Sequence, residues 1–128
     1  MGTVSVRYIV DDVGLAAEFY RDRLGFEMEF QAGSGFAMLS RGDLRLLLSP
    51  VSGPGGASQP MPDGRRPEPG GWNRFQIEVA DMDRAAAEMR EAGVRLRSEV
   101  IEGAGGKQLL IEDPAGNPVE LFEPVPRG

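Results

Sequence analysis

The sequence predicts an α+β fold made of two tandem βαβββ modules, each with a curved sheet of mixed parallel and antiparallel strands. Three observations predict it. Apolar and polar residues alternate over several short segments, apolar residues recur at helical spacing in two others, and the same order of elements occurs twice. The offset from Val10 to Asp12 is repeated from Val79 to Asp81. We expect one domain with a first module over residues 1–49, a Pro/Gly-rich linker over 50–71 and a second module over 72–128.

The first module begins with a strand over residues 4–10, in which Ser5, Arg7 and Ile9 lie on the face opposite to the valines and Tyr8. Asp12 is placed to cap a helix whose apolar stripe is formed by Ala16, Phe19, Tyr20 and Leu24. Gly25 is expected to end that helix in a left-handed conformation. Three more strands are predicted over residues 26–31, 35–40 and 43–49, separated by the turn residues Gly33–Ser34 and Arg41–Gly42.

The second module repeats this pattern after the linker. A strand is predicted over residues 74–79, Asp81 is the expected cap, and Met82, Ala85, Ala86 and Met89 form the helical stripe. Gly93 is expected to close the helix. Three further strands are predicted over residues 94–101, 107–112 and 118–123, with turns at 103–106 and 113–117.

Composition restricts the chemistry that the chain can carry. Its net charge of −6 disfavours nucleic acid as a partner, and the absence of cysteine excludes disulfides and thiolate sites. The absence of histidine removes the commonest metal ligand and general base. No apolar run approaches the length of a membrane span, and the N-terminus has no leader-like pattern, so we expect a cytoplasmic protein that does not bind membranes.

Two segments resemble a known family. Ala17 to Phe26 contains the phrase Phe-Tyr-x-x-x-Leu-Gly-Phe, and Glu112 to Leu121 contains Glu-Asp-Pro-Ala-Gly-Asn-Pro-Val-Glu-Leu. Both resemble the glyoxalase/bleomycin-resistance (vicinal oxygen chelate) superfamily, which includes dioxygenases. The resemblance implies a ligand cleft between two modules, of one chain or of two in a domain-swapped homodimer.

Many enzymes of this family hold a divalent metal ion on the first and last strands of each module. The resemblance places the four ligand positions at Ser5, Leu47, Arg74 and Glu120. Leu47 has no donor atom and Arg74 is a permanent cation, so the sequence predicts neither a metal nor another cofactor. Metal-free members of the family bind antibiotics in a dimer cleft without transforming them.

The predicted cleft face follows from strand parity. It presents arginines that can stack and form bidentate hydrogen bonds, with aromatic surface for a flat ligand. The expected ligand-binding residues are Ser5, Arg7, Ile9, Arg45, Leu47, Trp72, Arg74, Gln76, Glu78, Glu120 and Phe122. None of them is assigned a catalytic role.

Each of these assignments has a structural alternative. Arg7 and Arg45 would alternatively pair with acidic residues on neighbouring strands. Glu120 would form a salt bridge with Arg74, which we favour over catalysis. Trp72 would alternatively pack at a dimer seam.

The leading functional hypothesis is a metal-independent homodimer that sequesters an aromatic natural product, such as an antibiotic, and so confers resistance. The alternative is a metal-free isomerase, cyclase or lyase that uses Glu120 or Glu78 as a base. A third possibility is a bound organic cofactor or regulatory ligand without turnover. Ligand recovered unchanged favours binding, whereas product formed over multiple turnovers favours the enzyme.

Overall fold

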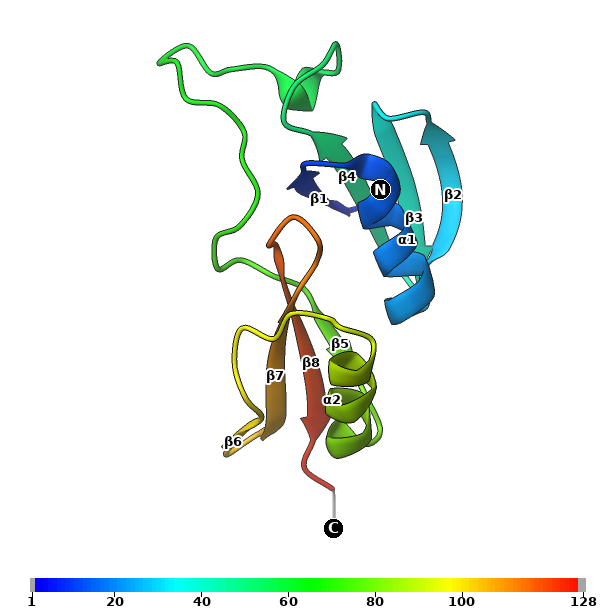
Figure 1. Cartoon of the computed structure of the whole chain (residues 1–128), viewed down its shortest axis with the longest axis vertical. Coiled ribbons are helices and arrows are strands. Elements are labelled where there is room, and N and C mark those ends of the chain that lie inside the picture. Colours follow the sequence, from blue (N-terminus) through cyan, green and yellow to red (C-terminus); the bar gives the residue numbers. More distant parts are fainter. Residues whose placement is uncertain (1, 127–128) are drawn as a thin grey trace. The chain divides into compact units, whose positions relative to one another are not determined.

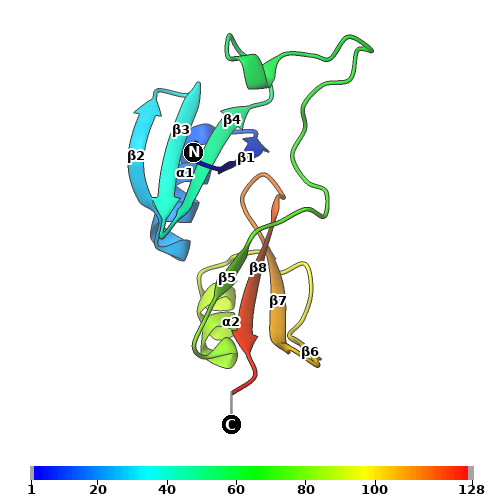
Figure 2. The ribbon, with the colours of Figure 1, turned by 180° about the vertical axis from the view of Figure 1, so that it is seen from behind.

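The computed structural model describes residues 2–126, and its backbone runs through the same order of elements twice (Figures 1 and 2). The first set comprises β1 (Ser5–Val10), α1 (Val13–Leu24), β2 (Glu27–Ala32), β3 (Phe36–Arg41) and β4 (Leu44–Pro50). The second set comprises β5 (Gln76–Glu78), α2 (Met82–Glu91), β6 (Ile101–Gly103), β7 (Gly106–Glu112) and β8 (Pro118–Pro124). The chain separates after Gly70 into two units, each with one set.

The two sheets have the same topology. Their strand orders are β1-β4-β3-β2 and β5-β8-β7-β6, so the first strand of each unit lies beside the last. That pairing is parallel, and the other pairs are antiparallel. The prediction of two βαβββ modules with mixed sheets is therefore confirmed.

Both helices begin at the predicted caps. The Asp12 carboxylate accepts a hydrogen bond from the backbone N–H of Leu15 at 3.0 Å, and the Asp81 carboxylate accepts one from Arg84 at 3.1 Å. Gly25 ends α1 with a φ of 71°, a conformation that favours glycine. The N–H of Phe26 then bonds to the carbonyl of Tyr20, so Phe26 belongs to the helix end and β2 starts one residue later than predicted.

One helix covers one face of each sheet, and that interface forms the core of the unit (Figures 1 and 2). In the first unit, the fully buried ring of Tyr20 makes edge contacts with Tyr8, Phe19 and Phe26 at centroid distances of 6.4, 5.2 and 5.5 Å. The core of the second unit is aliphatic, and its main members are Ile77, Met82, Ala86, Met89, Leu109, Ile111, Val119 and Leu121. The expected core positions Phe19, Tyr20, Met82 and Met89 are all confirmed as buried.

Two strands of the second module differ from the prediction. The strand expected over residues 94–101 is wrong: only Leu96 forms an isolated bridge, to Ile111, and β6 starts at Ile101. The Ser98 hydroxyl accepts the N–H of Leu110, which replaces a backbone partner and interrupts the ladder. The strand expected over 74–79 is shorter than predicted and covers only Gln76 to Glu78.

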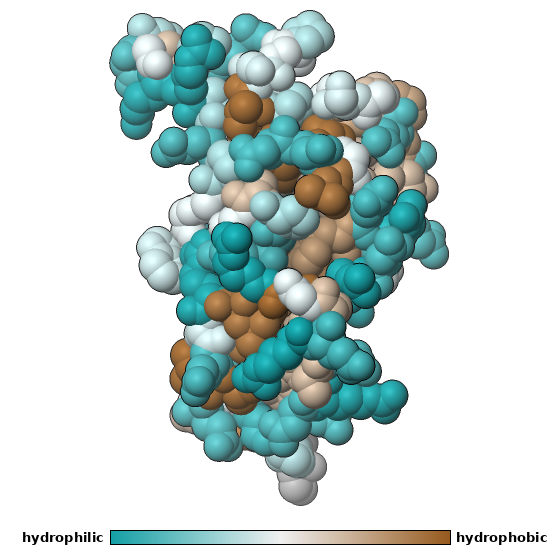
Figure 3. Space-filling model, viewed as in Figure 1, coloured by the Kyte–Doolittle hydropathy of each residue, from teal (hydrophilic) through white to brown (hydrophobic). Residues whose placement is uncertain are grey.

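The segment between β4 and β5 is held by local bonds. The Ser58 hydroxyl donates to the carbonyl of Pro50 at 2.6 Å, and the Gln59 amide donates to the carbonyls of Gly53 and Gly55. Its one regular element is a short 3₁₀ turn over Gly56–Ser58. Its visible surface is mainly hydrophilic in Figure 3, as expected for a segment with few large apolar side chains.

In the described part of the chain, none of the helices has the length and apolar character needed to span a membrane.

Candidate functional site

The first unit brings five predicted site residues onto the sheet face opposite α1. Because Tyr8 and Val10 point into the core, their neighbours on β1 point to the other face. The parallel register places Ser5 beside Arg45 and Arg7 beside Leu47. The five residues are Ser5, Arg7, Ile9, Arg45 and Leu47.

Arg7 has a different partner from the one that its structural alternative predicts. Its Nη1 donates to the hydroxyl of Ser49 at 2.8 Å, and Ser49 is buried. Among residues 2–126, no ion pair joins Arg7 or Arg45 to a carboxylate, so the expected cross-strand pairs with acids are wrong. Ser49 was missed, although it has the same parity on β4 as Arg45 and Leu47.

Apolar side chains continue this face across the sheet. The register aligns Arg7, Leu47, Met38 and Phe30 in one row over all four strands. The Phe30 side chain is 53% exposed, and its ring lies 6.3 Å from that of Phe36. Met38 and Phe30 were not predicted, because they lie on β3 and β2, whereas the expected site residues of this module are on its first and last strands.

The second unit places its predicted residues in the equivalent strands. Gln76 lies beside Glu120, and Glu78 lies beside Phe122, in the parallel β5–β8 pair. Trp72 and Arg74 lie just before β5 rather than within it. Strand parity therefore assigned the β5 and β8 residues to one sheet face correctly.

Glu120 is the centre of a polar network on this face. Its Oε1 accepts hydrogen bonds from Nε and Nη2 of Arg74 at 3.0 and 2.9 Å, and its Oε2 accepts one from the Gln76 amide at 2.6 Å. The Glu120 side chain is 11% exposed and that of Arg74 is 26% exposed. The predicted salt bridge is confirmed, and both carboxylate oxygens are engaged.

Trp72 is connected to the same network. Its carbonyl accepts a hydrogen bond from Nη1 of Arg74 at 3.3 Å, and its ring lies 4.7 Å from the guanidinium carbon of Arg97. Arg97 was not among the predicted residues. It precedes β6, in a segment that was predicted to be a regular strand, so strand parity gave no reason to place it near Trp72.

The four positions where the resemblance implies metal ligands do not fit a metal ion. Ser5 offers only a hydroxyl oxygen, and Leu47 has no atom that can bind a metal. Arg74 is cationic, and Glu120 already accepts three hydrogen bonds. Within residues 2–126, no group of three or more carboxylate, imidazole or thiol side chains is close enough to hold a cation. These residues offer hydrogen bonds, charge and apolar contact.

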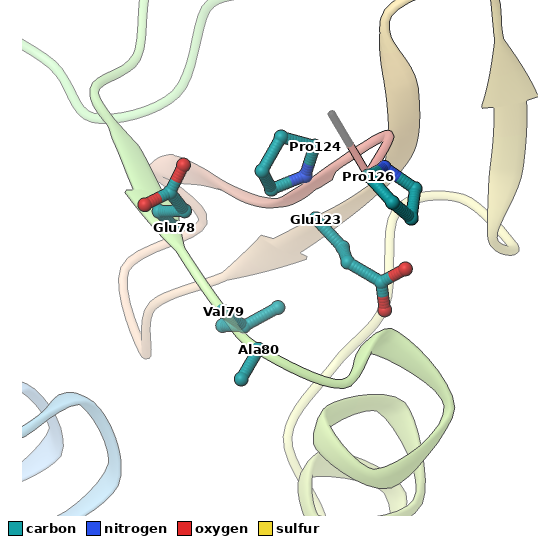
Figure 4. A pocket seen from close by; sticks show the side chains of 6 residues that line it. All are labelled: Glu78, Val79, Ala80, Glu123, Pro124 and Pro126. Carbon is teal, nitrogen blue, oxygen red and sulfur yellow. The ribbon is translucent and has the colours of Figure 1, made fainter. Parts of the chain in front are cut away.

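A hollow of about 310 Å³ lies where β8 ends, away from the Glu120 network. Figure 4 shows the carboxylates of Glu78 and Glu123 on different sides of it, and Pro124 and Pro126 also line it. The Glu123 carboxylate accepts the N–H of Met82 at 2.7 Å, so it caps α2. Of the predicted site residues, only Glu78 lines this hollow.

Comparisons with known proteins agree with this architecture. In solved structures, the chain is similar to a superfamily member from Sphaerobacter thermophilus at 26% identity, with a TM-score of 0.74 and coverage of 96% of this chain and 97% of that one. It is also similar to lactoylglutathione lyase from Agrobacterium tumefaciens, at 26% identity, a TM-score of 0.72 and coverage of 95% and 92%. A third similar structure is the bleomycin-binding protein of Streptomyces verticillus in complex with copper(II)-bleomycin, at 26% identity, a TM-score of 0.62 and coverage of 96% of each chain.

A family model matches residues 2–121, which is nearly the whole of the described chain. The matched region includes both modules, the Phe19-to-Phe26 phrase and the final hairpin. The chain therefore belongs to the glyoxalase/bleomycin resistance protein/dioxygenase superfamily.

Proposed function

We propose that this protein binds a small organic molecule, an aromatic natural product such as an antibiotic, and holds it without chemical change. Sequestration of this kind, by a homodimer in the cytoplasm, would protect a cell from the compound. The observation that carries the proposal is that Arg74 and Gln76 bind both carboxylate oxygens of Glu120. These charge-assisted hydrogen bonds hold the carboxylate in a network of the protein's own side chains, as part of a binding surface rather than as a free catalytic group.

Each unit carries residues that suit recognition of a flat, polar molecule. The first unit offers the guanidinium donors of Arg7 and Arg45 and the apolar area of Leu47, and the second unit offers the stacking area of Trp72 and Phe122. The similar bleomycin-binding protein provides a precedent for this role within the superfamily.

The second candidate function is a metal-free isomerase, cyclase or lyase. Glu78 favours it, because this carboxylate is exposed beside Phe122. The similar lactoylglutathione lyase shows that the superfamily also includes enzymes.

A thermal-shift screen with mass spectrometry tests the two candidates. The protein is incubated with a panel of aromatic antibiotics, including metal-free and copper(II)-bleomycin, and each compound that raises the Tm is recovered and weighed by mass spectrometry. We expect at least one compound to raise the Tm by several degrees and to return unchanged.

Product formed in molar excess over the protein, from any compound tested, would contradict sequestration. Loss of that turnover in Glu78→Gln would support the enzyme instead.

A further inference from the structure

Trp72 is both exposed and held in place. Trp72, the only tryptophan in the sequence, is 68% exposed. A free indole on a surface would sample several rotamers. Here one guanidinium lies over the ring at 4.7 Å, and another binds the carbonyl of the same residue at 3.3 Å.

The guanidinium over the ring belongs to Arg97, which is itself fixed by three further contacts. Its Nε donates to the Glu112 carboxylate at 2.9 Å, its Nη1 to the carbonyl of Gly71 at 2.6 Å and its Nη2 to the carbonyl of Gly116 at 2.9 Å. Only 17% of the Arg97 side chain is exposed. Every nitrogen of the guanidinium therefore has a partner.

The anchors of Arg97 belong to the hydrogen-bonded β7–β8 hairpin of the second unit, apart from Gly71. Gly116 lies in the turn between β7 and β8, where the buried Asp113 carboxylate accepts the N–H groups of Ala115 and Asn117 at 2.9 Å each. Glu112 is the last residue of β7. Arg97 thus connects the β7–β8 hairpin to Gly71, the residue before Trp72, and to the indole ring.

We propose that Arg97 is a positioning residue that presents Trp72 as a preformed stacking surface for a planar aromatic ligand. Arg97 covers one face of the ring, and the high exposure of Trp72 leaves the opposite face open. A side chain ordered before binding loses less entropy when the ligand arrives, which strengthens binding. This inference rests on the proposed binding function, and it adds a residue that does not itself touch the ligand.

Arginine suits this role better than lysine. Its planar fork serves three acceptors and one aromatic ring at the same time, whereas an ammonium group is a single point of contact. The Arg97→Lys variant should therefore keep the ion pair with Glu112 and lose the simultaneous hold on Gly71, Gly116 and the ring.

Intrinsic fluorescence tests the positioning step without any ligand, because Trp72 is the sole tryptophan. Arg97→Met should increase acrylamide quenching and lower the fluorescence anisotropy, and Arg97→Lys should give intermediate values. The matched control is Arg95→Met: Arg95 binds the other oxygen of Glu112 at 3.3 Å and is 76% exposed, whereas the guanidinium that lies over Trp72 is that of Arg97. Unchanged quenching and anisotropy in both Arg97 variants, with native circular dichroism, would overturn the proposal.

Calorimetry with metal-free bleomycin and the hits of the antibiotic panel tests the stacking step. We expect Arg97→Met to weaken binding roughly two- to tenfold, the range for ordering one side chain, and Trp72→Ala to weaken it further. Wild-type affinity in both variants would overturn stacking on Trp72. Failure of the wild-type protein to bind any compound would count against the proposed function, whereas the quenching result would still decide whether Arg97 holds Trp72.

Discussion

The two units of this chain share one backbone plan and differ in what they place on it. In each unit the first strand pairs in parallel with the last, beneath one covering helix. The first unit puts Leu47 beside Arg7, whereas the second puts Glu120 beside Gln76. The comparison shows that topology determines which positions are adjacent on the first and last strands of a unit. The side chains at those positions then determine whether the adjacent groups are apolar or charged.

The largest expected effect that tests this comparison is the loss of stability when a core leucine of either unit is truncated. Leu46 of β4 and Leu121 of β8 are both almost fully buried against their own helices. Each Leu→Ala substitution should lower the free energy of unfolding by about 2–5 kcal/mol, because it removes apolar contacts and leaves a cavity. Urea denaturation measures both. If one variant loses less than half as much unfolding free energy as the other, the two cores do not contribute equally to stability.

A smaller loss of stability is expected at Glu120 and Leu47, which occupy equivalent positions on the last strands of the two units. Glu120→Ala leaves the part-buried Arg74 guanidinium without its carboxylate and should cost about 2–3 kcal/mol, below the range for fully buried pairs. Leu47→Ala, at a half-buried position, should cost about 1 kcal/mol. Urea denaturation again provides the values.

An Arg74→Ala, Glu120→Ala double-mutant cycle then isolates the pair itself. A coupling energy near zero would mean that the Arg74–Glu120 pair adds no net stability to the second unit.

The smallest expected effect is the response to metals. Excess zinc, nickel or manganese should leave the Tm unchanged, because residues 2–126 offer no group of three or more metal-ligating side chains that would bind the folded state preferentially. Differential scanning calorimetry with and without a chelator measures this. A rise of several degrees that the chelator reverses would show a metal site in one of the units.

Much of the fold could be predicted because it depends on local patterns. The alternation around Tyr8 and the caps Asp12 and Asp81 are properties of short segments, so they are visible in the sequence. The β6 region could not be predicted in the same way. Its ladder is interrupted by the Ser98 hydroxyl, whose partner, Leu110, is remote in the sequence.

The candidate site likewise contains residues that could be predicted from the sequence and one that could not. The pairing of Arg74 with Glu120 was expected because the family resemblance places both residues at ligand positions on the first and last strands of the second module. Arg97 lies outside a regular strand and reaches Trp72 through tertiary folding, so no periodic pattern indicates it. Sequence patterns indicated the residues on the strands and gave no indication of Arg97, which contacts Trp72.

The parallel pairing of first and last strands also has a consequence for biosynthesis. Glu120 lies on β8, the last strand of the second unit to be synthesised, yet its partners Arg74 and Gln76 are made more than forty residues earlier. Until β8 is added, β5 has no neighbour in its sheet, and its edge stays open to other chains. A nascent or truncated chain that stops in the 113–117 turn would therefore lack the site and present an unpaired strand, a form that we expect quality-control proteases to remove.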